Sequence, residues 1–244
     1  MAEPLLSIVI PCLNENGVVN RLLDQLLAQQ TADIEIITAD SGSNDGTVEL
    51  LESYNERGVI VMQNAGIGVS KARNAGAHAA RGEWLLFLDA DTTLPKQFIG
   101  KLVGILVHEP AFDVATFRYR AATYNPFYFL YIFFSRLYQR LSALFGRQHV
   151  TGTGILVRAQ MHAAAGGFDE SLRFAEDLAY AQTLQGHGAR FTVLKLQTYV
   201  SVRRLRHFGW LRLLTFYVRF IVARWRGNDF HDGQYDFSEH KLKK

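Results

Sequence analysis

Residues 83–95 read EWLLFLDADTTLP, and this stretch joins a run of apolar side chains directly to a pair of carboxylates. The run WLLFL at 84–88 is short and continuous, which is typical of a β-strand that is covered on both faces of its sheet. Asp89 and Asp91 follow at once, and Pro95 ends the stretch. A buried strand that ends in two acids predicts a sheet with a functional site at its edge.

The same kind of apolar run recurs upstream, with helical segments between the runs. Strands are predicted at 5–10 (LLSIVI), 34–39 (IEIITA) and 59–63 (VIVMQ). Helices are predicted from near Asn14, at 47–55 and at 70–80. Strands that alternate with helices at this spacing indicate parallel βαβ units with right-handed crossovers. We therefore expect an α/β fold whose open, Rossmann-like and mostly parallel sheet is flanked by helices.

The second half of the chain is less regular. Strands are predicted at 112–120 and 150–158, and an aromatic-rich helical stretch is predicted between them, to about residue 147. A short helix should follow and end at Gly166 and Gly167. The chain has no internal repeat and no clear linker, so we expect one domain with a C-terminal helical elaboration.

Composition is that of an ordinary globular protein. The chain has 244 residues, of which 48% are hydrophobic and 20% charged, and its formal net charge is +3. Most of its arginines lie between residues 118 and 226, so one surface should be basic. The single cysteine, Cys12, allows no intrachain disulfide and suits a reducing compartment. The sequence has no basic signal-peptide start and no apolar run of about 18 residues, so we expect a cytoplasmic protein.

Ligands bind open α/β sheets outside the carboxyl ends of the strands. A polar segment follows each of the first four predicted strands, namely PCLNE (11–15), DSGSNDGT (40–47), NAGIGVSKARN (64–74) and DADTTLP (89–95). We expect polar residues to gather at this edge of the sheet and almost nowhere else in the first half of the chain.

Three of these segments contain candidate ligand-binding residues. Asp89 and Asp91 would repel each other unless they faced solvent in a turn or shared a divalent cation such as Mg²⁺ or Mn²⁺. Asp40 could accept hydrogen bonds from a ribose or a base, while Asn44 or Asp45 in the same segment could cap a helix. Lys71 stands where a dinucleotide-binding motif needs its third glycine, so that cofactor is not expected. Arg73 suits an anionic or carbonyl-bearing ligand.

Five segments, taken in order, carry a resemblance to a known family. They are SIVIPCLNE, ADSGSNDGT, GVSKARNAGAHAARGEWLLFLDADT, GGFDE and FAEDLAYAQTL, between about Leu5 and Leu184. As a set they resemble the family 2 glycosyltransferases with the GT-A fold. The resemblance implies an inverting enzyme that moves a sugar from a UDP- or GDP-sugar to an acceptor hydroxyl or phosphate. It also implies a nucleotide-sugar-binding half (1–117) and an acceptor-binding and catalytic half (118–206). Beyond the resemblance, the residue pattern predicts a C-terminal amphipathic helix and tail (207–244).

Individual roles follow from the resemblance residue by residue. The nucleotide-binding residues would be Pro11, Glu15, Asp40, Arg73 and Asp89, with Pro11 and Glu15 flanking the nucleotide and Arg73 holding its base. Asp91 would ligate Mn²⁺ or Mg²⁺ on the diphosphate. The backbone of TGTG (151–154) would approach the donor or the acceptor.

The resemblance also supplies the catalytic pair. Asp177 would be the general base that takes the proton from the acceptor hydroxyl, and Glu176 would position it. The same pair is also compatible with an ordinary helix start, where acids are favoured by the dipole. His207, Arg203 or Arg204 could add a metal ligand or a diphosphate contact, or could simply form a basic surface.

The C-terminal region predicts a basic amphipathic helix. Between Phe208 and Trp225 the apolar face includes two tryptophans, and arginines recur every seven residues on the other face, at Arg212, Arg219 and Arg226. This pattern favours either a peripheral contact with a membrane, and with it a lipid-linked acceptor, or packing on the sheet or on a second subunit. The arginines lie opposite an apolar stripe, which argues against nucleic acid.

Two other functions stay open on these residues. A protein of the same fold could hold a nucleotide sugar without transferring it. A metal-dependent nucleotidyltransferase is also α/β, but it should carry a glycine-rich segment with a basic residue after the first strand, and PCLNENG (11–17) has no basic residue.

Overall fold

The computed structural model describes residues 3–122, 150, 154–172, 175–201 and 215. Its centre is a seven-stranded sheet with the strand order β3-β2-β1-β4-β6-β5-β7. The strands are β1 (Leu6–Cys12), β2 (Ile34–Asp40), β3 (Val59–Met62), β4 (Trp84–Phe87), β5 (Val114–Ala121), β6 (Ile155–Arg158) and β7 (Phe191–Val200). All neighbours pair in parallel except those of β6, which is antiparallel to both β4 and β5. The expected mostly parallel α/β sheet is confirmed.

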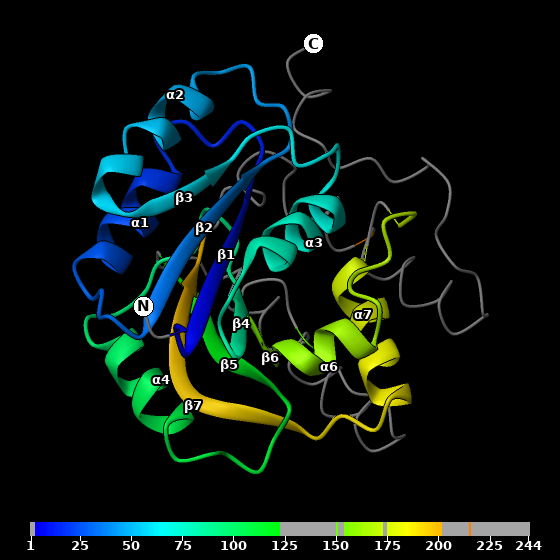
Figure 1. Ribbon diagram of the computed structural model, residues 1–244. Coiled ribbons are helices and arrows are strands. Elements are labelled where there is room, and N and C mark those ends of the chain that lie inside the picture. Colours follow the sequence, from blue (N-terminus) through cyan, green and yellow to red (C-terminus); the bar gives the residue numbers. More distant parts are fainter. Residues whose placement is uncertain (1–2, 123–149, 151–153, 173–174, 202–214, 216–244) are drawn as a thin grey trace.

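Helices cover both faces of the sheet (Figure 1). They are α1 (Val19–Leu27), α2 (Thr47–Glu52), α3 (Val69–Ala79), α4 (Phe98–Leu106), α6 (Ala159–Ala164) and α7 (Glu176–Gly186), with a 3₁₀ turn, η1 (Asn55–Arg57), before β3. Residues of α1, α2 and α4 form one apolar core with one face of β1, whereas residues of α3, α6 and α7 form a second core with the other face. Alternate residues of β1, such as Ile8 and Val9, therefore belong to different cores.

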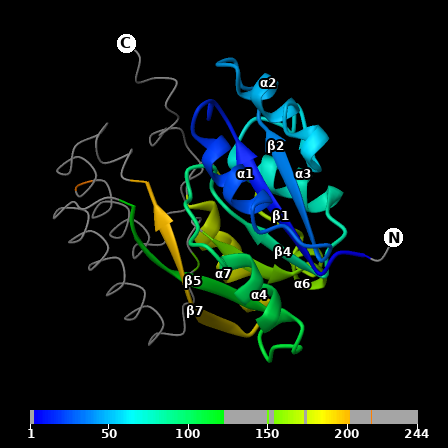
Figure 2. The ribbon, with the colours of Figure 1, turned by 90° about the vertical axis from the view of Figure 1, so that its left-hand side faces the viewer.

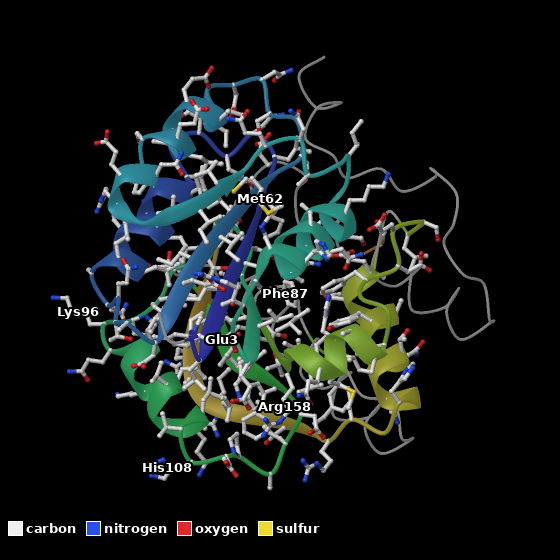
Figure 3. All side chains as sticks on the ribbon, viewed as in Figure 1. Glu3, Met62, Phe87, Lys96, His108 and Arg158 are labelled. Carbon is white, nitrogen blue, oxygen red and sulfur yellow. The ribbon has the colours of Figure 1, made fainter. Side chains whose placement is uncertain are left out.

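The strands place their carboxyl ends along one edge of the sheet. Met62, at the carboxyl end of β3, lies in the upper part of Figure 3, whereas Arg158, at the carboxyl end of the antiparallel β6, lies in the lower part. The loops after β1, β2 and β4 therefore share the upper edge, which we call the carboxyl edge.

Several predicted boundaries differ from the structure. The first helix begins at Val19 and not near Asn14, because Asn14 (φ 55°) and Gly17 (φ 72°) have left-handed backbone that interrupts a helix. α4 and β7 were not predicted. β5 includes residue 117, so the sheet continues across the boundary between the two expected halves. Gly166 and Gly167 follow α6 with positive φ values, as expected.

Two buried polar residues of the first half lie away from the edge where polar residues were expected to gather. Ser7 and Glu35 are buried near the amino ends of β1 and β2, at the opposite edge of the sheet. Glu35 accepts hydrogen bonds there from Ser7 Oγ (2.6 Å) and from the backbone N–H of Arg81 (2.6 Å).

β5 and β7 run side by side at the far end of the sheet (Figure 2). Their last residues, Ala121 and Val200, pair in register. The expected helical stretch that ends near residue 147 lies outside the described residues, as does the expected helix at 208–225 apart from residue 215, which is helical. In the part of the chain that the structure describes, we find no helix with the length and hydropathy needed to cross a membrane.

Candidate active site

The loops after β1 and β2 are tied together by hydrogen bonds between side chains and backbone. The N–H of Asn14 donates to Ser43 Oγ (2.8 Å), and in return the N–H of Asn44 donates to Asn14 Oδ1 (3.0 Å). The N–H of Glu15 donates to Thr47 Oγ1 (2.9 Å). This bonding fixes the segment from Pro11 to Glu15 against the start of α2.

Asp40, the last residue of β2, organises its own loop. Its Oδ2 accepts hydrogen bonds from the N–H groups of Gly42 (2.8 Å) and Ser43 (2.9 Å), and its Oδ1 accepts one from the Ser43 hydroxyl. Gly42 has a φ of 90°, a left-handed backbone that favours glycine. Asp40 is only 1% exposed. The loop therefore presents Asp40 as a fixed carboxylate at the carboxyl edge.

The expected helix cap is partly confirmed at Asp45. Gly46 is the residue before α2, and its φ of 89° is again left-handed. Asp45 accepts hydrogen bonds from the hydroxyl of Thr47 and from the N–H groups of Thr47 (3.0 Å) and Asn16 (3.2 Å). Burial alone would raise the pKa of Asp45, but these hydrogen bonds lower it below the ordinary value. The ionised carboxylate thus holds the start of α2.

The loop after β4 carries Asp89 and Asp91, the predicted nucleotide-binding acid and the predicted metal ligand. Leu88 and Ala90 are buried, so the alternating Asp89 and Asp91 belong to the more exposed side of this segment. The N–H of Thr92 donates to the carbonyl of Asp89 (2.9 Å), which closes a turn. Thr93 then exchanges two backbone hydrogen bonds, each 2.9 Å, with Tyr199 of β7.

This antiparallel contact brings the end of β7 to the loop that carries Asp91. Tyr199 lies two residues before Ser201, the last described residue before 202–214. Arg203, Arg204 and His207 lie outside the described part of the chain.

Arg73 of α3 joins the two halves of the site. Its Nη2 donates to Asp89 Oδ1 (3.0 Å), and its Nη1 donates to Glu176 Oε1 (2.8 Å), while its side chain is only 2% exposed. Burial alone would lower the pKa of Arg73, but the negative charges of Glu176, Asp89 and Asp177 raise it. The guanidinium is therefore a permanent cation between carboxylates that are 87 positions apart in the sequence.

Glu176 and Asp177 form the first turn of α7, as the helix-start interpretation predicted. Asp177 Oδ1 accepts a hydrogen bond from the N–H of Leu178 (2.8 Å). Ala175, directly before the pair, has a φ of 57°, a strained value for a residue with a Cβ. The second half of the chain thus supplies two acids to the carboxyl edge of the first half.

The resemblance implies a bound Mn²⁺ or Mg²⁺, and the described residues can be compared with the ligands that such an ion needs. The described residues contain no group of three or more His, Cys, Asp or Glu side chains able to hold a metal ion. A single partly exposed carboxylate such as Asp91 fits the way Mg²⁺ and Mn²⁺ bind when phosphate and water supply the other ligands. His207 lies outside the described residues.

Sequence reasoning did not assign a role to the aromatic residues beneath Arg73. Phe168, from the GGFDE segment, lies with its ring centre 5.1 Å from Arg73 Cζ and stacks on Tyr180 of α7 with ring centres 3.9 Å apart. The Tyr180 hydroxyl is 2.6 Å from Nδ1 of His162 on α6. The GGFDE segment was noted as a motif, but the sequence contains no signal for the contact with Arg73.

Solved structures with a similar architecture identify the fold. The chain aligns with TarS of S. aureus, residues 1–349 in complex with UDP, at a TM-score of 0.63 and 22% identity, covering 81% of this chain and 60% of that one. It aligns with the mannosyltransferase PcManGT of Pyrobaculum calidifontis, in complex with GDP-Man and Mn²⁺, at a TM-score of 0.67 and 18% identity, covering 99% and 68%. At such identities the likeness concerns the fold, which is of the GT-A type.

The sequence then gives the family. A model described as "Glycosyl transferase family 2" matches residues 7–166, and the chain belongs to this family. It is 39% identical over 117 residues to a PGL/p-HBAD biosynthesis glycosyltransferase of Mycobacterium bovis, covering 46% of this chain and 45% of the relative. It is 37% identical over 106 residues to the validoxylamine A glucosyltransferase of Streptomyces hygroscopicus subsp. limoneus, covering 41% and 23%. The chain thus matches less than half the length of these relatives.

Proposed function

We propose that the chain is an inverting glycosyltransferase that moves a sugar from a UDP- or GDP-sugar to a hydroxyl or phosphate of an acceptor. One observation carries the proposal: the guanidinium of Arg73 bonds to both Asp89 and Glu176. Asp89 is close in sequence to Asp91, the proposed metal ligand, and Glu176 precedes Asp177, the proposed base. The metal ligand and the base must lie close together, because the acceptor oxygen attacks, and the diphosphate leaves, the same anomeric carbon.

Residues 1–117 would bind the donor in this proposal. Pro11, Glu15 and Asp40 would line the nucleotide, since their loops are fixed side by side at the carboxyl edge. Asp89 would face the ribose. The role of Arg73 in holding the base stays a prediction, because two of its N–H groups are already bonded to Asp89 and Glu176. The titles of two similar structures name UDP and GDP-Man, which supports a nucleotide-sugar donor.

Residues 118–206 would bind the acceptor and supply the base. Asp177 would accept the proton of the acceptor oxygen as that oxygen attacks, and Glu176, fixed by Arg73, would position it. Asp91 would hold Mn²⁺ or Mg²⁺, with His207 as a further ligand. When bound, that cation supplies positive charge that stabilises the departing diphosphate.

The proposal is tested by donor binding and turnover across UDP- and GDP-sugars with Mn²⁺, Mg²⁺ or EDTA. Asp91→Ala should lose metal-dependent binding, whereas Asp177→Asn should bind the donor normally and lose turnover. Asp24→Asn is the matched control, since Asp24 pairs with Arg57 on the exposed side of α1 and should change neither property. Donor binding without product in the wild type would favour a nucleotide-sugar-binding protein, and no binding at all would reject both functions.

We also propose that residues 207–244 associate peripherally with a membrane whose lipid-linked sugar acceptor the enzyme uses. The arginines on one face of the predicted helix and the tryptophans on the other support this reading. Co-sedimentation with anionic liposomes at low salt should be strong and should fall as salt rises. Absence of sedimentation at low salt would reject it.

A further inference from the structure

Asn74, the residue after Arg73 on α3, uses its side-chain amide entirely on the GGFDE segment. Its Nδ2 donates to the carbonyl of Phe168 (2.9 Å), and its Oδ1 accepts from the N–H of the same residue (2.8 Å). The second Nδ2 proton is directed to Glu170 Oε1 (2.9 Å). The Asn74 amide thus bonds to both the N–H and the carbonyl of Phe168, as the backbone of a neighbouring β-strand would.

The segment is shaped to receive this amide. A Cβ on Gly167 would lie 2.7 Å from Asn74 Oδ1, closer than real Cβ atoms approach, so only glycine allows the contact. Gly167 also has a φ of 78°, which favours glycine. Both the close contact with Asn74 and the positive φ therefore require a glycine at position 167.

The paired backbone fixes the ring of Phe168. Phe168 is buried between Phe87 of β4, whose ring centre is 5.0 Å away, and Tyr180 of α7. Its ring lies against the guanidinium of Arg73. A guanidinium is attracted to the face of an aromatic ring by a cation–π interaction, so the position of the Phe168 ring limits where the Arg73 side chain can lie.

We propose that Asn74 is a positioning residue for the transfer reaction. By holding Phe168 it sets Arg73, and through Arg73 it sets the two carboxylates, Asp89 and Glu176, that flank the reaction. This inference rests on the proposed function, but its structural basis is the contact between Asn74 and Phe168. Asn74 touches neither carboxylate in any recorded hydrogen bond, so its influence passes through Phe168 and Arg73.

Asn74→Asp is the sharpest variant, because it keeps the shape of the side chain and removes both Nδ2 protons. Its carboxylate would face the carbonyl of Phe168 and the carboxylate of Glu170, which repel it. Gln29→Ala is the matched control. Gln29 Oε1 also accepts a backbone N–H across a packing interface, that of Ile99 (3.2 Å), but it lies on the other face of the sheet from α7.

Two measurements on the full chain test the inference. Hydrogen exchange of amides in 166–172 and 175–180 should become about tenfold faster in Asn74→Asp and stay at the wild-type rate in Gln29→Ala. Turnover should fall by about 10²-fold with the donor KM near that of the wild type, because a small misplacement affects the reacting geometry more than donor binding. In an Arg73→Lys background the same substitution should add little, since both act through one path.

The outcomes separate the inference from the proposed function. An active wild type whose exchange is unaltered by Asn74→Asp would overturn the inference alone, as would faster exchange with unaltered turnover. Fully additive effects of Asn74→Asp and Arg73→Lys would also overturn it, because they would mean two independent contributions. A wild type that turns over none of the nucleotide sugars would overturn the proposed function, and the catalytic part of the inference with it.

Discussion

The two edges of the sheet each bond a glutamate to an arginine, but they do so in opposite ways. At the amino edge, Glu35 accepts four hydrogen bonds, from Ser7 Oγ and from the N, Nε and Nη2 atoms of Arg81. Ser7 Oγ in turn accepts the N–H of Gly82 (2.8 Å), and the Arg81 side chain is 60% exposed. At the carboxyl edge, Arg73 is the buried partner, and no hydrogen bond joins its Nε to any of the described residues.

The two edges differ in how completely their side chains are paired. The amino-edge bonds join β1, β2 and the loop before β4, so they hold the sheet together. At the carboxyl edge, no described residue bonds to the carboxylate of Asp91, and Ala175 keeps a strained backbone. Incomplete pairing and local strain cost stability, and they are typical of sites that serve a ligand. The following predictions test this division between a structural and a functional edge.

The largest effect is expected at the carboxyl edge. Asp177→Asn should lower kcat by about 10³-fold, because an amide cannot accept the acceptor's proton. Its melting temperature should stay close to that of the wild type. Steady-state kinetics together with thermal unfolding measure both quantities. A variant that unfolds early, with turnover per folded molecule intact, would assign Asp177 to structure and break the comparison.

The amino edge should show the reverse behaviour. Glu35→Gln should lower the free energy of unfolding by about 2 kcal/mol, because an amide NH₂ would oppose the donors of Ser7 and Arg81. Turnover per folded molecule should be unchanged. Urea denaturation and kinetics measure the two, and a large loss of kcat in folded protein would contradict the division.

Acid should weaken the amino edge as well. Burial would raise the pKa of Glu35, but hydrogen bonds from Ser7 and Arg81 outweigh it and lower the pKa below the ordinary value. A carboxylate whose pKa is lower in the folded state stabilises the fold at pH values above its unfolded-state pKa. This stabilisation is lost as the pH falls through the folded-state pKa. The stability difference between wild type and Glu35→Gln should therefore shrink below about pH 4.

A third effect concerns the core beneath Arg73. Burial lowers the pKa of His162 to about 4, so the folded protein keeps this imidazole neutral where the unfolded chain binds a proton. Stability from this residue is present above pH 6.5 and falls by about 2 kcal/mol between pH 7 and pH 5. His162→Gln should remove that dependence, whereas His78→Gln, on an exposed part of α3, should retain it. Urea titrations at both pH values provide the measurement.

The smallest effect is expected from relieving strain. Ala175→Gly should raise the free energy of unfolding by about 0.5–1 kcal/mol, because glycine adopts a φ of 57° without a Cβ clash. Ala179→Gly, inside α7, is the control and should lower stability by a similar amount. Stabilisation of Ala175→Gly with reduced kcat would indicate that the strain itself helps to position Glu176 and Asp177.

The parts of the fold that were predicted correctly depend on local patterns. The run IEIITA became β2 (Ile34–Asp40), because a continuous apolar run suits a central strand. The first helix formed as predicted, although its start moved, because its buried residues Val19, Leu22, Leu23 and Leu26 recur at the spacing of one helical face. β7 carried a weaker signal, an alternation interrupted by an exposed Val193, which is typical of an edge strand.

Long-range contacts were beyond the reach of the sequence. Glu35 lies inside an apolar run, and its partners Ser7 and Arg81 are 28 and 46 positions away. The link from Asp89 to Glu176 through Arg73 has the same character, since it joins the loop after β4 and helix α3 to helix α7 in the second half of the chain. The motifs suggested which residues matter, and the fold determined which of them touch.

The register of β5 and β7 has a consequence for how such a protein could diversify. Ala121 and Val200 are neighbours, so the chain leaves the sheet for 123–149 and for 202–244 from adjacent points. Both departure points belong to β5 and β7, at one end of the strand order, whereas Asp40 ends β2, near the other end. A chimera that exchanges the two segments together has three junctions, after residues 122, 149 and 201, and two of these, at 122 and 201, follow the paired ends of β5 and β7. The segments after β1, β2 and β4 would be inherited unchanged in such a chimera.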